Sequence, residues 1–233
     1  MGVKAVIFDL DDTLVYSGID YKGMKRSLIN FLVEAGVDPD LLSEEMPNIE
    51  IFRVALEHLR DRGLSEDKIK RIFGEANAIL DRAEMESLGR ARLMDGALEI
   101  LKSLKRLELK IGIVTNGCRR YAAEIIKMSS LDDYIDALIA RDDVPSPKPS
   151  PDHLLKALEV LGVSAEEAIF VGDHWIDALC AKNAGIKFIL FNNRGGCWEE
   201  IRGRDMAIAT ISDLRDITNF LPSGREMLER NNY

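Results

Sequence analysis

The sequence predicts an α/β fold in which a parallel β-sheet carries helices on both faces. Short apolar segments recur along the chain and alternate with segments of helical periodicity, which is the pattern of β-α-β units. The alternation is interrupted once, between residues 15 and 90, where only helical patterns occur. A chain of 233 residues, 46% of them hydrophobic, can bury a substantial core. We therefore expect a Rossmann-like sheet core with an inserted α-helical cap domain.

Six short apolar segments are expected to form the strands. They are residues 3–8, 110–115, 135–140, 168–172, 187–191 and 206–211. Helix signals lie between them. Asp95 is expected to cap one helix, and Ser150 is expected to cap another, with Pro151 at its first position. Ser164 and Glu167 match a capping box just before the fourth strand.

The segment without strands is expected to be a helical domain over residues 15–89, beginning with a loop over residues 15–20. Three apolar stripes at helical spacing predict three helices that bury a core together. The stripes are Met24, Leu28, Phe31 and Leu32; Ile51, Phe52, Ala55, Leu56 and Leu59; and Ile69, Ile72, Phe73, Ala76, Ile79, Leu80 and Ala83. The α/β core would then comprise residues 1–14 and 90–222, followed by a polar tail over residues 223–233.

The charge and hydropathy of the chain exclude several classes of protein. The net charge is −9 and the pI is about 5.0, which argues against nucleic acid or an anionic membrane as the main partner. No segment approaches the roughly 18 apolar residues of a membrane span, and the N-terminus leads into a strand without a secretory signal. Cys118, Cys180 and Cys197 lack metal-binding spacing. We interpret them as free thiols of a cytoplasmic protein.

Polar side chains follow the predicted strands at the points where the strands end. Asp9 and Asp11 follow the first strand, Thr115 and Asn116 follow the second, and Asp173 follows the fourth. Ligands of open parallel sheets bind outside the carboxyl ends of the strands. These side chains are therefore expected to meet in one site.

The acids and one lysine predict a metal and phosphate site. Ionised carboxylates withdrawn from water must be paired or bound to a metal, and oxygen ligands suit Mg²⁺ together with phosphate oxygens. Asp9, Asp11 and Asp173 are the expected ligands of one Mg²⁺. Lys148, which has a proline on either side, is expected to offer a fixed positive charge to a phosphoryl group, and Thr115 adds a hydroxyl donor.

The order of these motifs resembles that of the haloacid dehalogenase superfamily. The matching segments are Asp9-Leu10-Asp11-Asp12-Thr13-Leu14, Thr115-Asn116, Lys148-Pro149 and Gly172-Asp173 with Asp177. Four motifs in this order at strand ends make a specific signature, although each is short. The resemblance spans residues 1–195. The helical insertion directly after the first motif is similar to that of the phosphoglycolate-phosphatase-like branch, and this implies a cap that closes over a small substrate and excludes water.

The resemblance implies a role for each acid at the strand ends. Asp9 would be the nucleophile that forms an aspartyl-phosphate. Asp11 would be the general acid for the leaving group and then the base for water, and its backbone carbonyl would bind Mg²⁺. Asp173 would be the third protein ligand of the metal. Asp177 would act through a metal-bound water or by holding Lys148.

Three polar residues would hold the phosphoryl group, according to the same resemblance. Thr115, the amide of Asn116 and Lys148 would bind its oxygens, and Thr13 would brace the first loop. An acid at Asp11 makes dehalogenation an unsuitable reaction, because a halide leaves without a proton whereas an alkoxide needs one.

The leading hypothesis is therefore a Mg²⁺-dependent phosphatase that hydrolyses a small phosphorylated metabolite through Asp9. Two alternatives stay open: a phosphomutase of a sugar phosphate, and a non-catalytic phosphate-binding protein on the same fold. Several neighbouring residues have open roles in specificity, and they are Tyr16, Ser17, Tyr21, Lys22, Arg119, Arg120, His174 and Trp175. The sequence is compatible with a monomer or a homodimer.

Overall fold

A computed structural model describes residues 2–192 and 203–221 of the chain. The chain divides into two compact units. One unit contains the residues up to Ser17 and those from Ala91 onward, and the other is Gly18–Arg90. The predicted tail over residues 223–233 lies outside the described residues, as does Cys197.

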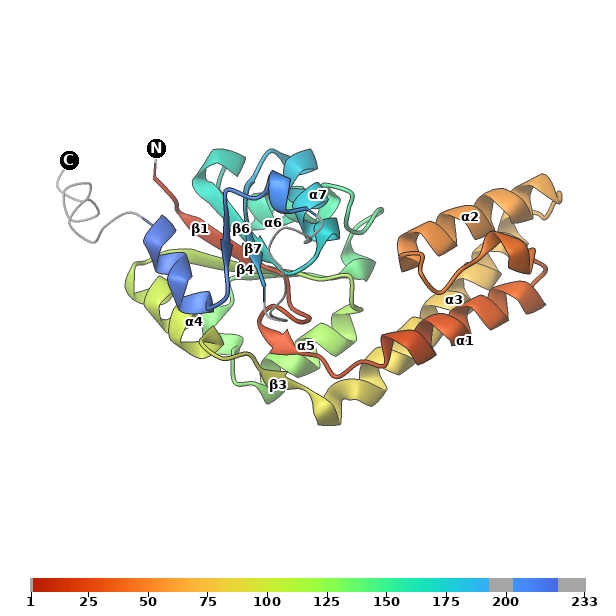
Figure 1. Cartoon of the computed structure of the whole chain (residues 1–233), viewed down its shortest axis with the longest axis horizontal. Helices are drawn as coiled ribbons and strands as arrows, with labels where there is room; N and C mark the ends of the chain where they lie inside the picture. The colour runs from red at the N-terminus through yellow and green to blue at the C-terminus, as the bar shows by residue number, and fades with distance from the viewer. Residues whose placement is uncertain (1, 193–202, 222–233) are drawn as a thin grey trace. The chain divides into compact units, whose positions relative to one another are not determined.

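The first unit is built on a six-stranded sheet with the order β5-β4-β1-β6-β7-β8, in which all neighbouring strands are parallel (Figure 1). The strands are β1 (Ala5–Phe8), β4 (Lys110–Val114), β5 (Ala137–Ile139), β6 (Ala168–Gly172), β7 (Lys187–Phe191) and β8 (Ala209–Ile211). The predicted parallel α/β sheet is confirmed. Ala5 is in register with Lys110 on one side and with Ala168 on the other, so β1 has the central place between β4 and β6.

Helices cover both faces of the sheet, as Figure 1 shows. They are α4 (Ala97–Arg106), α5 (Arg119–Met128), α6 (Asp152–Leu161) and α7 (Trp175–Ala184). Helix α6 packs on β4 and β5, and α7 packs on β6 and β7. Helices α4 and α5 lie on the opposite side of the sheet from α6 and α7 (Figure 1). Short 3₁₀ turns connect elements at Pro39–Leu41, Leu88–Arg90, Asp132–Tyr134, Arg141–Asp143, Ala165–Glu167, Arg204–Met206 and Leu214–Phe220.

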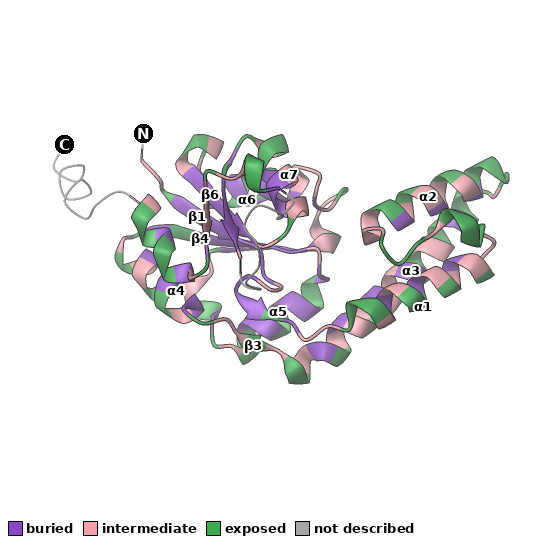
Figure 2. Ribbon diagram, viewed as in Figure 1, coloured by how far each residue is buried: buried purple, intermediate pink, exposed green. Residues whose placement is uncertain are grey.

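Strand β1 is buried on both faces (Figure 2). Ala5 and Ile7 belong to the hydrophobic core beneath α6 and α7. Because successive side chains of a strand point to opposite faces, Val6 and Phe8 face the other layer, and both are fully buried. An uninterrupted apolar run is what a central parallel strand requires, and the polar residues begin only where the strand ends.

The second unit contains helices α1 (Tyr21–Glu34), α2 (Asn48–Asp61) and α3 (Glu66–Ser87). Their apolar stripes meet in a core of their own that includes Leu28, Leu59 and Leu80. The rings of Phe52 and Phe73 pack edge to face with centroids 5.3 Å apart. The predicted helical insertion after the first strand is confirmed.

The prediction of a loop over residues 15–20 was wrong for its first two residues. Val15–Tyr16 forms β2, which pairs antiparallel with β3 (Arg92–Leu93). The two strands flank the helical insertion on either side. A two-residue strand has too little pattern to be recognised in sequence, and its partner lies more than seventy residues away.

Two of the predicted helix starts were also wrong by one residue. The N-cap of α4 is Gly96 rather than Asp95, and Gly96 has a φ of 81°, which glycine tolerates without steric strain. The N-cap of α6 is Pro151 rather than Ser150. The predicted capping box before β6 is confirmed, because the Ser164 amide donates to Glu167 Oε2 at 3.1 Å.

Candidate active site

The polar residues that follow β1, β4 and β6 lie together because these three strands are neighbours in the sheet. Asp9 and Asp11 follow β1, Thr115 follows β4 and Asp173 follows β6. The strand order changes direction at β1, and such switch points create a crevice at the carboxyl edge of the sheet. The topology therefore places the predicted residues at the position where this fold binds ligands.

Asp9 and Lys148 form a buried ion pair at the centre of this site. Lys148 Nζ lies 2.5 Å from Asp9 Oδ1 and 2.7 Å from Asp177 Oδ1. The third contact of the ammonium is with the carbonyl oxygen of Val114 at 3.3 Å. The exposed fractions of Asp9 and Lys148 are only 6% and 3%. Because an ammonium has three N–H donors, these contacts saturate it and fix the position of the charge.

The charges in the site shift the pKa of both partners. Burial alone would lower the pKa of Lys148, but the Asp177 and Asp9 carboxylates outweigh it and hold this pKa above its ordinary value. Burial raises the pKa of the Asp9 carboxyl, while Lys148 acts in the opposite direction and the carboxylates of Asp177 and Asp173 add to the rise. The lysine is therefore charged and lies within a group of carboxyl side chains.

An acidic cluster beside this ion pair could bind a metal ion. Asp9, Asp173 and Asp177 each offer a carboxylate oxygen, and these oxygens lie within 4.8 Å of one another. Lys148 contacts two of these acids, Asp9 and Asp177. Three hard oxygen donors this close together fit a hard divalent cation.

The carboxylate of Asp11 is held on both of its oxygens. Thr115 Oγ1 donates to Asp11 Oδ2 at 3.1 Å, and the Tyr121 hydroxyl donates to Asp11 Oδ1 at 2.7 Å. Thr115 Oγ1 in turn accepts from the amide of Gly117 at 2.9 Å. Thr13 lies on the other side of the loop, where its hydroxyl donates to Asp9 Oδ2 at the long distance of 3.5 Å. The carboxylate of Asp11 thus has a defined position.

The backbone of Lys148 is clamped by two side chains. Asn116 Nδ2 donates to the Lys148 carbonyl, and the Lys148 amide donates to Asn116 Oδ1, both at 3.0 Å. The same amide donates to His153 Nδ1 at 3.1 Å, while His153 Nε2 lies 3.0 Å from the carbonyl oxygen of Ala140. Both ends of the Asn116 side-chain amide therefore contact the backbone of Lys148.

Asp177 links the acidic cluster to the start of α7. Its Oδ1 accepts from Lys148, and its Oδ2 accepts from the amide of His174 at 3.1 Å. The ring of His174 caps the helix by accepting from the amide of Ile176 at 3.4 Å. Gly172 is required here, since a Cβ at this position would lie 2.7 Å from Asp177 Cβ. His174 thus has a capping role.

Other residues with open roles have local partners. Arg119 forms an ion pair with Asp143 at 2.6 Å and donates to the carbonyl of Leu138, which gives it a structural partner within the core unit. The Arg92 guanidinium lies 4.2 Å from the centre of the Tyr16 ring. Ser17 is buried at the end of the same segment.

Sequence reasoning missed two buried residues of the site, Tyr121 and His153. Tyr121 stands at an apolar position of α5, beside the buried Ala122 and Ile125. A buried tyrosine hydroxyl needs a partner, and that rule is the only sequence signal that could have indicated it. His153 lies in the first turn of α6, and its two contacts are with the Lys148 amide and the Ala140 carbonyl.

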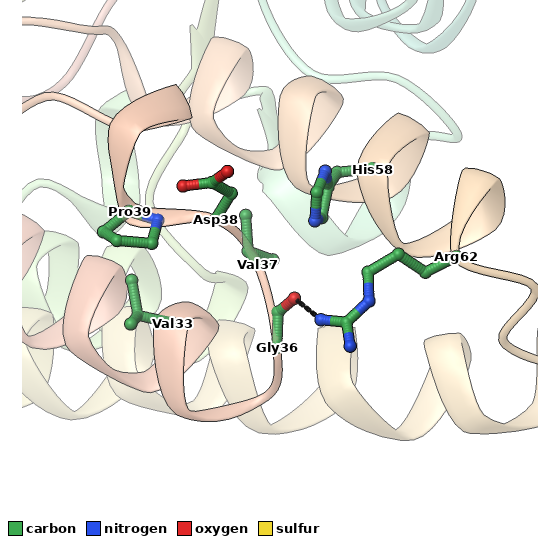
Figure 3. A pocket seen from close by; sticks show the side chains of 7 residues that line it. All are labelled: Val33, Gly36, Val37, Asp38, Pro39, His58 and Arg62. Atoms are coloured by element: carbon green, nitrogen blue, oxygen red, sulfur yellow. Dashed lines mark hydrogen bonds between the residues drawn. The ribbon is translucent and has the colours of Figure 1, made fainter.

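The helical unit carries a shallow depression of its own (Figure 3). It is lined by Val33, Gly36, Val37, Asp38, Pro39, His58 and Arg62. The guanidinium of Arg62 donates to the Gly36 carbonyl across it. Arg62 is thereby engaged in joining α2 to the turn after α1.

No helix in the described ranges 2–192 and 203–221 has the length and apolar character needed to cross a bilayer.

The fold and the site together define a class of enzyme in which a buried aspartate lies beside a lysine and an acidic cluster at the carboxyl edge of a Rossmann-like sheet. The family model for haloacid dehalogenase-like hydrolases matches residues 6–191. The chain belongs to this family, and the predicted family, with its helical insertion after the first strand, is confirmed.

Relatives in this family include pyrophosphatases and a phosphoglycolate phosphatase. The chain is 36% identical to pyrophosphatase PpaX of Bacillus cereus strain Q1 over 220 residues, which cover 93% of this chain and 97% of the relative. It is 37% identical to PpaX of Halalkalibacterium halodurans over 125 residues, and 28% identical to phosphoglycolate phosphatase 1 of Pseudomonas aeruginosa over 187 residues. These matches cover 53% and 79% of this chain.

The chain spans little more than half the length of several of these relatives: 58% of the H. halodurans protein and 56% of PpaX from two strains of B. cereus. It spans 67% of the P. aeruginosa protein.

Among solved structures, a HAD phosphatase from Thermococcus onnurineus superposes with a TM-score of 0.59 at 25% identity, over 93% of this chain and 97% of that chain. The predicted enzyme class is confirmed at the level of this hydrolase family.

Proposed function

We propose that this protein is a Mg²⁺-dependent phosphatase that hydrolyses a small phosphorylated substrate through an aspartyl-phosphate on Asp9. One observation carries the proposal: Asp9 is buried at the carboxyl end of β1, paired with Lys148 and adjacent to the carboxylates of Asp173 and Asp177. The membership in the hydrolase family supports the same conclusion.

In the first half of the reaction, a carboxylate oxygen of Asp9 attacks phosphorus and forms the acyl-phosphate bond. The bond from phosphorus to the leaving oxygen breaks, and Asp11 donates a proton to that oxygen. The positive charge of Lys148 stabilises the charge on the phosphoryl oxygens, because phosphoryl transfer depends mainly on positioning and electrostatics, and Thr115 holds the carboxylate of Asp11 through its hydroxyl. Asn116 contributes by holding the Lys148 backbone.

In the second half, the carboxylate of Asp11 accepts a proton from water while the water oxygen attacks the phosphorus of the aspartyl-phosphate. The acyl-phosphate bond breaks, inorganic phosphate is released and Asp9 is regenerated as a carboxylate. Asp11 has now lost and regained one proton, so the cycle is balanced. The contacts of Asp11 with Thr115 and Tyr121 support its assignment to proton transfer, since they fix its carboxylate.

Asp9 and Asp173 would hold Mg²⁺ together with the backbone carbonyl of Asp11, and Asp177 lies in the same acidic cluster. When bound, the ion supplies positive charge that offsets the repulsion between the Asp9 carboxylate and the phosphoryl oxygens. Asp177 also fixes Lys148 through its contact at 2.7 Å. The donor set of carboxylate and carbonyl oxygens is the one that Mg²⁺ prefers.

The relatives suggest which substrates should be tried first. A relative that is 36% identical and almost entirely covered by this chain is named a pyrophosphatase, and a more distant one is named a phosphoglycolate phosphatase. We therefore propose inorganic pyrophosphate as the first candidate and phosphoglycolate as the second. Both are small, and both present a phosphoryl group joined to a leaving oxygen.

The proposed nucleophile is tested by Asp9→Asn with p-nitrophenyl phosphate, pyrophosphate and phosphoglycolate in the presence of Mg²⁺. Loss of the nucleophile is expected to lower kcat by at least about 10³-fold on every substrate that the wild type hydrolyses. The matched control is Asp12→Asn, which makes the same substitution in the same loop at a residue in the left-handed region, with a φ of 60°, that asparagine also adopts.

Metal dependence is measured on the wild-type enzyme in the same assay. EDTA is expected to abolish turnover, and an excess of Mg²⁺ is expected to restore it. Turnover by Asp9→Asn within tenfold of wild type would refute the scheme, and full activity in EDTA would refute the role of the metal. A wild type that releases phosphate from none of these substrates would refute phosphatase activity toward them.

A further inference from the structure

Tyr121 places a buried hydroxyl directly on the carboxylate of Asp11. The hydroxyl oxygen lies 2.7 Å from Asp11 Oδ1, and the whole residue is inaccessible to solvent. Tyr121 belongs to the first turn of α5, whereas Asp11 follows β1. The contact therefore joins two segments that are 110 residues apart in sequence.

The surroundings of Tyr121 fix its ring as well as its hydroxyl. A Cβ at Gly117 would lie 3.1 Å from Tyr121 Cδ1 and 3.3 Å from Thr115 Oγ1, so the loop after β4 packs against the ring without room for a side chain. The same loop supplies Thr115, which donates to the second oxygen of Asp11. Tyr121 and Thr115 thus hold the two oxygens of one carboxylate from two directions.

We propose that Tyr121 is a positioning residue for proton transfer by Asp11, an inference that rests on the proposed phosphatase function. A free aspartate side chain samples several rotamers, whereas proton transfer requires the carboxylate within hydrogen-bonding distance of the leaving oxygen. The Tyr121 hydroxyl removes part of that freedom. It acts through Asp11 and does not contact the reacting atoms.

The test is Tyr121→Phe, which removes the hydroxyl and keeps the ring. The variant and the wild type are compared by kcat/KM for two monoesters: an alkyl phosphate, whose alkoxide must be protonated as it leaves, and p-nitrophenyl phosphate, whose phenolate leaves without a proton. We expect kcat/KM to fall about 10- to 100-fold for the alkyl phosphate, within the range that general acid catalysis contributes, and less than threefold for p-nitrophenyl phosphate.

The ratio of the two values separates positioning from a purely structural role. A structural defect lowers the amount of active enzyme and reduces both values equally, so the ratio stays at the wild-type value, and that result would overturn the proposal. An increase in the alkyl phosphate rate would also overturn it. The matched control is Tyr134→Phe, which lies outside the site on the turn Asp132–Tyr134 and should leave the ratio unchanged.

A second Tyr121 variant and parallel assays of the wild type and Asp9→Asn separate a folding defect, a failure of the proposed function and a failure of the proposed role of Tyr121. If Tyr121→Phe does not fold, Tyr121→Met provides a flexible apolar side chain that fills the same space, and the same change in ratio is expected. The wild type and Asp9→Asn are assayed in parallel. If the wild type is inactive, or Asp9→Asn is active, the proposed function itself has failed. If both behave as expected and the ratio is unchanged, only the role of Tyr121 is refuted.

Discussion

His153 shows how a single buried side chain holds the backbone that carries Lys148. It is fully buried, its Nδ1 accepts from the Lys148 amide, and its Nε2 lies beside the Ala140 carbonyl. These partners require a neutral ring that carries its proton on Nε2. Burial, assisted by the charge of Lys148, lowers the pKa of His153 to about 4. The imidazole is therefore neutral at any physiological pH.

The shifted pKa of His153 predicts a loss of stability in acid. In the unfolded chain this histidine has a pKa of roughly 6.5. Below that pH the unfolded state binds a proton on this group, whereas the native state leaves the group neutral. The stabilisation is complete above pH 6.5 and is lost as the pH falls toward 4. Between pH 7 and pH 5 the free energy of unfolding should fall by about 2 kcal/mol through this group alone.

The contribution of His153 is isolated with His153→Gln, whose side chain cannot titrate but can still donate toward Ala140. Urea unfolding is measured for both proteins at pH 7 and pH 5, and the losses are compared. The wild type should lose about 2 kcal/mol more than the variant. Equal losses in the two proteins would show that the native histidine titrates normally.

At the scale of elements, the turn from β6 into α7 decides where Asp177 lies. The strand ends at Gly172 and the helix begins at Trp175, so Asp177 stands in the first helical turn. Its carboxylate accepts from the His174 amide and folds back toward the strand end. This close approach leaves no space for a Cβ at Gly172. A glycine with an ordinary φ is required here for space rather than for conformation.

Gly172→Ala is predicted to destabilise the protein and to lower its activity. The added Cβ would lie 2.7 Å from Asp177 Cβ, Cγ and Oδ2, so the helix start must move and the Asp177 contact with Lys148 is weakened. Overpacking of this kind costs about 1–3 kcal/mol, measured by urea unfolding, and kcat should fall in parallel.

The matched control is Gly74→Ala on the exposed side of α3, where a new Cβ meets no atom within 4 Å. This substitution should stabilise the protein by up to about 1 kcal/mol, because alanine is a better helix former than glycine. The change in the free energy of unfolding is therefore expected to have opposite signs for the two glycine substitutions. A neutral Gly172→Ala would contradict the steric account of the β6–α7 turn.

At the scale of the whole molecule, the chain crosses between the two units at two adjacent points. Arg90 Nε donates to the Gly18 carbonyl at 2.9 Å, within the helical unit. On the other side, Tyr16 pairs with Arg92 in the ribbon of β2 and β3. Each unit also has its own hydrophobic core. The helical unit is thus an insertion whose ends lie side by side.

Removal of the helical unit is predicted to leave a folded sheet domain. Replacing residues 18–90 by Asn-Gly joins Ser17 to Ala91 through a two-residue turn suited to an antiparallel hairpin. We expect native-like circular dichroism and one cooperative thermal transition, because the sheet keeps its core. The full-length chain is the control. An insoluble product, or a transition without cooperativity, would show that the sheet unit depends on the insertion.

The sequence alone was sufficient for the α/β class, the helical insertion and the placement of polar residues at the strand ends. These features depend on local patterns: apolar runs such as Val6–Phe8, helical stripes, and acids placed directly after strands. The topology then follows from general rules for parallel sheets. For this reason Asp9, Asp173 and Lys148 could be assigned to one site before any distance was known.

The tertiary structure decided which partner each polar group has. Tyr121 lies 110 residues from Asp11, and Asn116 lies 32 residues from the Lys148 backbone that it clamps. Hydrogen bonds act over about 3 Å, so such pairs form only when packing has brought distant segments together. No periodicity or spacing in the chain encodes them. The sequence thus determined which polar groups stand at the strand ends, and the packing of helices on the sheet determined how they are held.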